Sequence, residues 1–225
     1  MSEWWSYRLS DFLLFSPRTY YRLFELYNAA IWPAQIASVL LGLAALMLLR
    51  RGGPLGGSAA AAILAACWAW VAIAFHLDRY ATINWAAPWA AAAFLAQAAL
   101  LVWAGVIGNR LSAPSRLGPA GRAGIGIFLI ALAAQPAIGP LLGRGWRQAE
   151  IFGVAPDPTA IGTLGLLLAA AGPARWGLMV LPVLWCAVTG ATLWAMSAPD
   201  AWVAPAAALL TLALAAWQSL KARAG

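Results

Sequence analysis

Charged residues are scarce in this chain of 225 residues: they make up 9% of it, whereas hydrophobic residues make up 64%. Soluble globular domains carry about 25% charged and about 45–50% apolar residues. This composition therefore excludes an ordinary soluble domain. Together with a mean hydropathy of +0.79, it predicts an all-α integral membrane protein with a single helical bundle.

Lysine, histidine and cysteine are also rare. The only lysine, Lys221, lies at the end of the last apolar segment, which excludes a retinal Schiff base within a span. The only histidine, His76, excludes a bis-histidine haem site, and Cys67 and Cys186 lie singly in apolar runs without metal-ligand spacing. Motifs of zinc proteases, serine hydrolases, ATPases and thiol oxidases are absent. The sequence thus predicts no metal site, identifies no cofactor and disfavours an enzyme.

Seven apolar segments are separated by breaks that contain glycine, proline and charged residues. A helix needs roughly 20 apolar residues to cross the hydrocarbon core of a bilayer, and all segments but the fifth have about that length. The predicted spans are 31–49, 59–77, 85–108, 124–143, 158–172, 174–196 and 201–220. They form one predicted polytopic bundle over residues 31–225.

The charges divide unevenly between the two sides of this seven-span arrangement. The side with the N-terminus receives all seven acidic residues and six basic ones, a net charge of −1, and the other side receives eight basic residues and no acid; −1 and +8 sum to the net charge of +7. The positive-inside rule then predicts an outside N-terminus and an inside C-terminus. Because this rule accounts for the basic surplus, no nucleic-acid partner is predicted.

The segment 1–30 precedes the first span and is predicted to contain an amphipathic helix on the outer leaflet. Ser16 followed by Pro17 is a typical N-cap and first helical position. Aromatic and aliphatic residues then fall on one helical face and charged residues on the other. A helix that packs against the bundle or against a partner remains an equal alternative.

An acidic residue between two prolines, Asp157, lies at the start of the fifth predicted span. If Pro158 is the first helical residue, Asp157 is an N-cap whose carboxylate accepts backbone N–H groups. The span of about 15 residues covers only about 22 Å, so Asp157 is expected below the membrane surface. A carboxylate at that depth indicates a functional site by default.

Other polar residues are predicted to lie at the same depth as Asp157. Pro136 and Pro140 interrupt the fourth span and free backbone carbonyls, which favours a segment that lines a cavity. We therefore predict an outward-facing polar cavity whose candidate ligand-binding residues are Asp157, His76, Asp78, Asn84, Gln135, Glu150 and Thr159. The alternative is an interfacial salt-bridge network among Asp78, Arg79, Arg144, Arg147 and Glu150.

Three stretches of the chain, YNAAIWPAQ at 27–35, CWAWVAIAFHLDRYATINWAA at 67–87 and FGVAPDPTAIGTLGLLL at 152–168, resemble a family of small multi-pass bacterial membrane proteins of unknown function. The similarity covers nearly the whole chain and is carried by Y-N-x-A-I-W-P-A-Q and F-G-V-x-P-x-P-T. Relatives read P-C-P-T where this chain has Asp157, so thiol chemistry is not implied here. The resemblance implies a polytopic helical protein of the bacterial cytoplasmic (inner) membrane and no particular substrate.

Two classes of function remain open. The first is a binder or transporter of a small molecule or ion, with an outward-facing site near Asp157, His76 and Asn84. The second is a non-catalytic accessory subunit of a larger membrane complex. The predicted partners are the lipid bilayer and either another membrane protein or further copies of this chain. A membrane enzyme that uses the acids and the histidine on a lipid ranks third.

Overall fold

The computed structural model describes residues 15–112, 114, 116–172 and 174–224. This part of the chain is helical and forms no strand beyond an isolated bridge between Ser112 and Ala171. The α-helices are α1 (Pro17–Ala30), α2 (Ala34–Arg51), α3 (Gly53–Trp70), α4 (Ala87–Leu100), α5 (Pro119–Leu129), α6 (Gln135–Leu141), α7 (Pro156–Ala169), α8 (Arg175–Ala195) and α9 (Val203–Ala224). Short 3₁₀ turns occupy Tyr80–Thr82 and Trp146–Gln148.

Six helical segments within the described residues are long and apolar enough to cross a membrane, which indicates a multi-pass membrane protein. They are Ala34–Arg51, Leu55–Thr82, Ala87–Ile107, Pro119–Leu141, Arg175–Ala195 and Val203–Lys221. They coincide with six of the seven predicted spans. Three of them contain π-helical turns, at Val71–Leu77, Leu101–Ile107 and Ile130–Ala134.

The fourth predicted span is continuous through its prolines. The π-helical turn Ile130–Ala134 joins α5 to α6, in which Pro136 occupies the first turn and Pro140 the interior. Because a π-helical turn shifts the hydrogen-bonding pattern by one residue, it accommodates the missing N–H of Pro136 without unwinding. The predicted interruption is therefore a local change of helix type.

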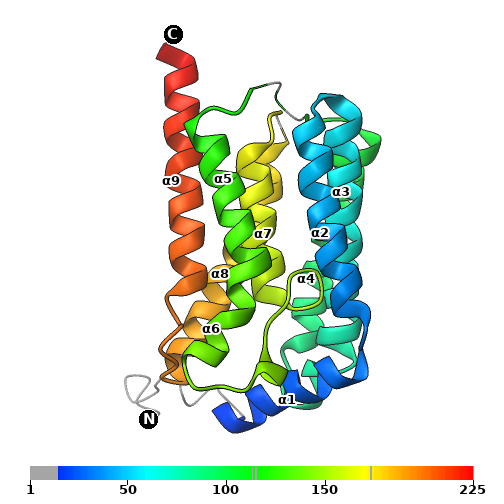
Figure 1. Cartoon of the computed structure of the whole chain (residues 1–225), viewed down its shortest axis with the longest axis vertical. Coiled ribbons are helices and arrows are strands. Elements are labelled where there is room, and N and C mark those ends of the chain that lie inside the picture. Colours follow the sequence, from blue (N-terminus) through cyan, green and yellow to red (C-terminus); the bar gives the residue numbers. More distant parts are fainter. Residues whose placement is uncertain (1–14, 113, 115, 173, 225) are drawn as a thin grey trace, which may run out of the picture.

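The remaining predicted span, 158–172, corresponds to α7. At 14 residues, α7 is about 21 Å long and does not have the length of the other six. Every residue of α7 is buried, and Figure 1 shows it surrounded by the longer helices. A helix that is apolar on all sides belongs in the interior of a bundle. The helix lengths therefore leave the count of seven spans unconfirmed.

Two glycines allow α7 to lie close to α5. A Cβ atom at Gly124 would lie 2.5 Å from the carbonyl oxygen of Gly165, and a Cβ atom at Gly165 would lie 2.7 Å from that of Gly124. Both distances are shorter than van der Waals contact, so a side chain at either position would separate the helices. Small residues at helix contacts are typical of membrane bundles.

Helix α1 lies across one end of the bundle (Figure 1). It begins at Pro17, and the side chain of Ser16 accepts a hydrogen bond of 3.2 Å from the backbone N–H of Thr19, which confirms the predicted helix start. Its apolar face is buried against the bundle through Tyr20, Leu23, Phe24 and Tyr27. Residues 1–14 of the predicted segment 1–30 lie outside the described residues.

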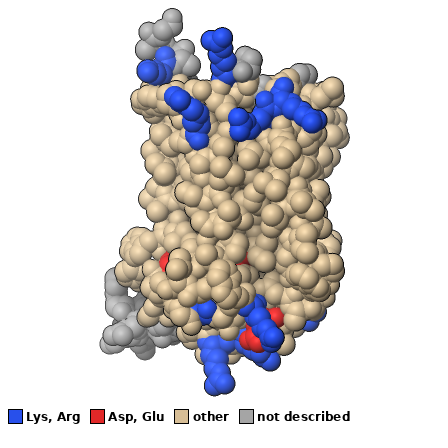
Figure 2. Space-filling model, in the orientation of Figure 1, with Lys and Arg blue, Asp and Glu red and all other residues tan. Residues whose placement is uncertain are grey.

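The charges of the described residues separate along the bundle. In Figure 2, the end that carries α1 shows both acidic and basic side chains, whereas the opposite end shows basic side chains alone. Exposed tryptophans gather at the α1 end, in the connections and in the last turn of α8: Trp32, Trp85, Trp146, Trp194 and Trp202. Between the two ends lies a broad surface without charge (Figure 2), as a bilayer requires.

Candidate functional site

The carboxylate of Asp157 is held by two side chains of α8. The indole N–H of Trp185 donates to Oδ1 at 2.8 Å, and the hydroxyl of Thr189 donates to Oδ2 at 2.9 Å. Asp157 is 3% exposed. Since both carboxylate oxygens accept hydrogen bonds from neutral donors, this geometry fits an ionised carboxylate.

The predicted N-cap role of Asp157 is wrong. Helix α7 begins at Pro156, and its N-cap is Ala155, whose backbone is extended. Pro156 rather than Pro158 provides the restricted φ of the first turn, so Asp157 is already inside the helix. Its side chain points sideways to α8 instead of back to the helix terminus.

A buried polar cluster surrounds Asp157 at this end of the bundle. Arg144, in the segment after α6, forms an ion pair with Asp200, in the connection between α8 and α9. Arg144 also lies over the ring of Tyr21, with its guanidinium carbon 4.4 Å from the ring centroid. These side chains bring α1, α6, α7 and α9 together around one set of charges.

A cavity of about 10 Å³ lies at the centre of this cluster, the space of about one water molecule. Its polar lining consists of Gln135, Arg144, Gln148, Glu150, Asp157 and Asp200. Three oxygens of this set are enclosed and without a hydrogen-bond partner: Gln135 Oε1, Glu150 Oε2 and Asp200 Oδ1. These three are acceptors, and the enclosed donor of the same set without a partner is Arg144 Nε, so the unpaired acceptors of the cluster outnumber its unpaired donors.

The acids of the cluster outnumber its bases. Three carboxyl groups line the cavity with a single guanidinium group, that of Arg144. Burial raises the pKa of Glu150 well above the ordinary value of a glutamate, and the negative charge of Asp157 raises it further, while Arg144 lowers it. Charges that are removed from water and incompletely paired favour proton uptake.

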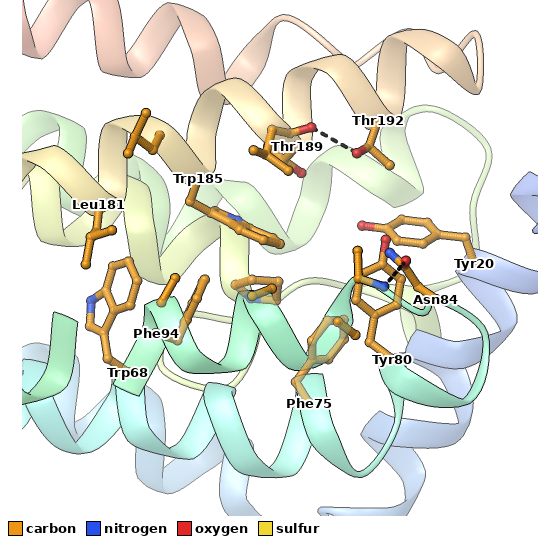
Figure 3. Close-up of a pocket in the computed structure, with 17 residues that line it drawn as sticks. Tyr20, Trp68, Phe75, Tyr80, Asn84, Phe94, Leu181, Trp185, Thr189 and Thr192 are labelled. Atoms are coloured by element: carbon orange, nitrogen blue, oxygen red, sulfur yellow. Dashed lines mark hydrogen bonds between the residues drawn. The ribbon is translucent and has the colours of Figure 1, made fainter. Parts of the chain in front are cut away.

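An apolar pocket of about 280 Å³ lies on the other side of Trp185 and Thr189. Its walls come from the π-helical turn Val71–Leu77, from α4 and from α8 (Figure 3). Hydroxyl and amide groups of Tyr20, Asn84 and Thr192 lie at the end near α1, and Trp68 and Leu181 lie at the opposite end (Figure 3). The pocket is therefore polar at one end and apolar at the other.

This pocket is open to the surface between α4 and α8. Leu184 and Val188 line it and are more than half exposed, at 54% and 53%. Both belong to the uncharged middle of a predicted span. A molecule can therefore reach the pocket sideways from the hydrocarbon region.

His76 lies deep in the bundle, fully buried, with both ring nitrogens lacking a hydrogen-bond partner. The centroid of its ring is 4.6 Å from that of Phe94 and 5.0 Å from that of Trp185. His76 thus packs as part of an aromatic cluster, behind the wall of the pocket. Through Trp185 it is one side chain removed from Asp157.

The structure brings together only some of the predicted site residues. Gln135, Glu150 and Asp157 line one small cavity, whereas Asn84 lines the apolar pocket. Asp78 is exposed on a surface groove beside α1. Thr159 is buried, and its hydroxyl donates a hydrogen bond of 2.6 Å to the carbonyl of Ala155 and accepts one of 2.9 Å from the N–H of Gly153.

The alternative salt-bridge network forms with other partners. Among the described residues the ion pairs are Arg22–Glu25 and Arg144–Asp200, so the pairing predicted among Asp78, Arg79, Arg144, Arg147 and Glu150 is wrong. Asp200 lies in the cluster at the α1 end, but the sequence did not predict it as a site residue. Its one local signal is the dipeptide Ala-Pro, which precedes Asp200 as it precedes Asp157.

Trp185 and Thr189 are site residues that carry no sequence signal. They lie in the middle of an apolar span, 28 and 32 residues after Asp157, and only the packing of α8 on α7 brings them to the carboxylate. Within the described residues, no group of three histidine, cysteine or acidic side chains is arranged to hold a metal ion.

Comparison with known proteins gives a family without an assigned activity. No curated protein and no solved structure matches the chain. A family model described as a family of unknown function (DUF6064) matches residues 18–225. The chain therefore belongs to this family of unknown function.

Proposed function

We propose that this protein binds a neutral amphipathic molecule from the membrane in the pocket between α4 and α8. The observation that carries the proposal is the division of that pocket into a polar end and an apolar end (Figure 3). Its volume of about 280 Å³ is close to the lower limit of small-molecule sites, about 300 Å³. Transport, as opposed to binding, is a further step of the same proposal.

The polar end of the pocket favours an uncharged headgroup. Tyr20, Asn84 and Thr192 offer hydroxyl and amide groups without charge. Asp157 lies behind Trp185 and Thr189, which line the pocket, and a buried negative charge there repels an anionic headgroup in a medium of low dielectric constant. A molecule with a hydroxyl or carbonyl head and an apolar tail matches both ends.

We further propose that α7 is the seventh crossing and that the α1 end faces outwards in the bacterial cytoplasmic membrane. Supporting this, α1 lies at one end and α9 ends at the other (Figure 1), which requires an odd number of crossings between them. The segment before α7 is buried, with Phe152 at 0% and Val154 at 3% exposed, so it covers the depth that α7 does not. Helix α1 then lies at the outer interface.

Native mass spectrometry of the protein released from its own membrane tests the binding proposal. Ala93 lines the pocket, whereas Ala92 is its exposed neighbour on α4. We expect the wild type and Ala92→Leu to carry a small apolar molecule and Ala93→Leu, which fills the pocket, to lose most of it. Retention of the same molecule by Ala93→Leu, or no bound molecule in the wild type, would contradict the proposal.

The same measurement addresses the second function class. An accessory subunit would leave the membrane together with stoichiometric copies of a foreign protein. The exposed tryptophans of the α1 end, Trp85, Trp146 and Trp202, are of the kind that is enriched at protein interfaces as well as at lipid interfaces. Foreign subunits without a pocket-dependent small molecule would favour the accessory role.

A further inference from the structure

The buried cluster of acids at the α1 end lines a different cavity from the apolar pocket. We propose that it is a proton-binding site in which Glu150 holds one exchangeable proton and shares it with Gln135, while Asp157 and Asp200 stay ionised. The argument rests on which oxygens have donors, on the balance of charge and on access to water.

The hydrogen bonds distinguish the three carboxyl groups. Asp157 accepts from Trp185 and Thr189 through its two oxygens, and Asp200 accepts from the guanidinium group of Arg144. Both are therefore stabilised in the ionised form. Glu150 Oε2 is enclosed and accepts no hydrogen bond, so burial destabilises the charge of Glu150, and the nearby charge of Arg144 offsets this only in part.

A proton on Glu150 turns one of the unpaired acceptors of the cluster into a hydrogen-bond donor. An ionised carboxylate only accepts hydrogen bonds, whereas a protonated one also donates. Gln135 Oε1 lines the same cavity, belongs to a residue only 8% exposed and has no partner. A donor on Glu150 supplies what this unpaired acceptor requires, because leaving a buried acceptor unsatisfied is costly.

The net charge of the cavity also favours one bound proton. With all groups ionised, three carboxylates and one guanidinium give the cavity a net charge of −2, and one proton reduces it to −1. The elevated pKa of Glu150, caused first by burial and then by Asp157, agrees with this distribution. The ionisable groups that face Glu150 are Arg144 before it in the chain, Asp157 on α7, Asp200 before α9, and Tyr20 and Tyr21 on α1.

Glu150 is also the acid of the cluster that water can reach most easily. Asp157 and Asp200 are 3% and 8% exposed, whereas Glu150 is partly exposed as a residue although its Oε2 is enclosed. It lies in the segment between α6 and α7, outside the membrane-crossing helices. A proton can therefore enter and leave at Glu150 without passing through the hydrocarbon region.

Infrared difference spectroscopy of the full chain in lipid nanodiscs, titrated from acid to alkaline pH, tests this proposal. A protonated carboxyl group has a C=O stretch that disappears when it ionises. We expect a band that titrates well above the ordinary range of a glutamate, that is absent from Glu150→Gln and that is retained in Glu25→Gln. Glu25 is the matched control because it lies on the surface of α1, paired with Arg22 at 2.7 Å.

A second variant tests the partner of the proton. Gln135→Met keeps the volume of the side chain but removes the acceptor, and we expect the midpoint of the band to fall by about one pH unit, the tenfold weakening that the loss of one hydrogen bond produces. An unchanged midpoint would overturn the role of Gln135. The absence of a high-pH carboxyl band would overturn the proposal and leave a structural water in the cavity.

Titration with sodium chloride or choline chloride at constant pH separates a proton site from a sodium site. We expect the band to be the same in both salts. Loss of the band in sodium alone would assign the cavity to a sodium ion and overturn the proton site. None of these readouts depends on the apolar pocket, so the proton site and the proposed ligand binding can fail separately.

Discussion

Trp185 donates its indole N–H to Asp157 across the contact between α8 and α7, at 2.8 Å. One face of the same indole borders the apolar pocket, and its ring lies 5.0 Å from that of His76. Trp185 therefore lies, together with Thr189, between the buried charges and the apolar pocket, and both side chains contact Asp157 and the pocket.

Removal of this hydrogen bond is expected to destabilise the fold. Trp185→Phe keeps an aromatic ring but leaves one oxygen of Asp157 buried without its donor, which we expect to lower the free energy of unfolding by about 1–2 kcal/mol. The measurement is unfolding in mixed micelles with increasing sodium dodecyl sulfate. Trp194→Phe, on the exposed face of the same helix, is the control. If both variants lower the free energy of unfolding equally, the hydrogen bond between Trp185 and Asp157 does not stabilise the fold.

The orientation can be tested with two exposed glycines at opposite ends of the bundle. A side chain at Gly145, on the α1 end, or at Gly118, on the basic end, meets no atom within 4 Å, so cysteine is tolerated at both. We expect a membrane-impermeant maleimide to label Gly145→Cys in intact cells and Gly118→Cys only after the membrane is opened. The native Cys67 and Cys186 are buried and serve as an unlabelled background. The reverse labelling pattern would show that the basic end faces outwards and would contradict the proposed orientation.

Features that depend on local sequence were predictable, as the start of α1 and the six long helices show. Ser16 and Pro17 form the cap within one turn, and the apolar runs define the spans because a bilayer imposes its own length. The depth of Asp157 in the membrane, expected from the short fifth span, stays a prediction. The predicted N-cap role of Asp157 was wrong, because two prolines flank it and the sequence does not tell which one begins the helix.

Features that depend on the packing of distant helices could not be predicted. His76, Asp78 and Asn84 are neighbours in the sequence, yet one lies in the aromatic core, one on a surface groove and one in the apolar pocket. The π-helical turn Val71–Leu77 changes the helical phase just before the 3₁₀ turn, so residues that share a face in an ideal helix separate. The Arg144–Asp200 pair joins segments 56 residues apart, and no periodicity connects them.

The last prediction concerns the contact between α5 and α7. Two glycine-to-alanine substitutions on α5 are expected to have different effects on the free energy of unfolding. A Cβ atom at Gly124 lies 2.5 Å from the oxygen of Gly165 and 2.9 Å from the N atom of Ala169. Backbone atoms cannot move aside as a flexible side chain would, so Gly124→Ala is expected to lower the free energy of unfolding by about 1–3 kcal/mol.

Gly126→Ala is the matched control for this contact. A Cβ atom there meets nothing within 4 Å, and alanine is the better helix former by about 1 kcal/mol, so this variant is expected to be neutral or more stable. Unfolding in mixed micelles measures both. If both variants change stability in the same direction, the close approach of α5 and α7 is not what holds α7 at the centre of the bundle, and the buried position of Asp157 would need another explanation.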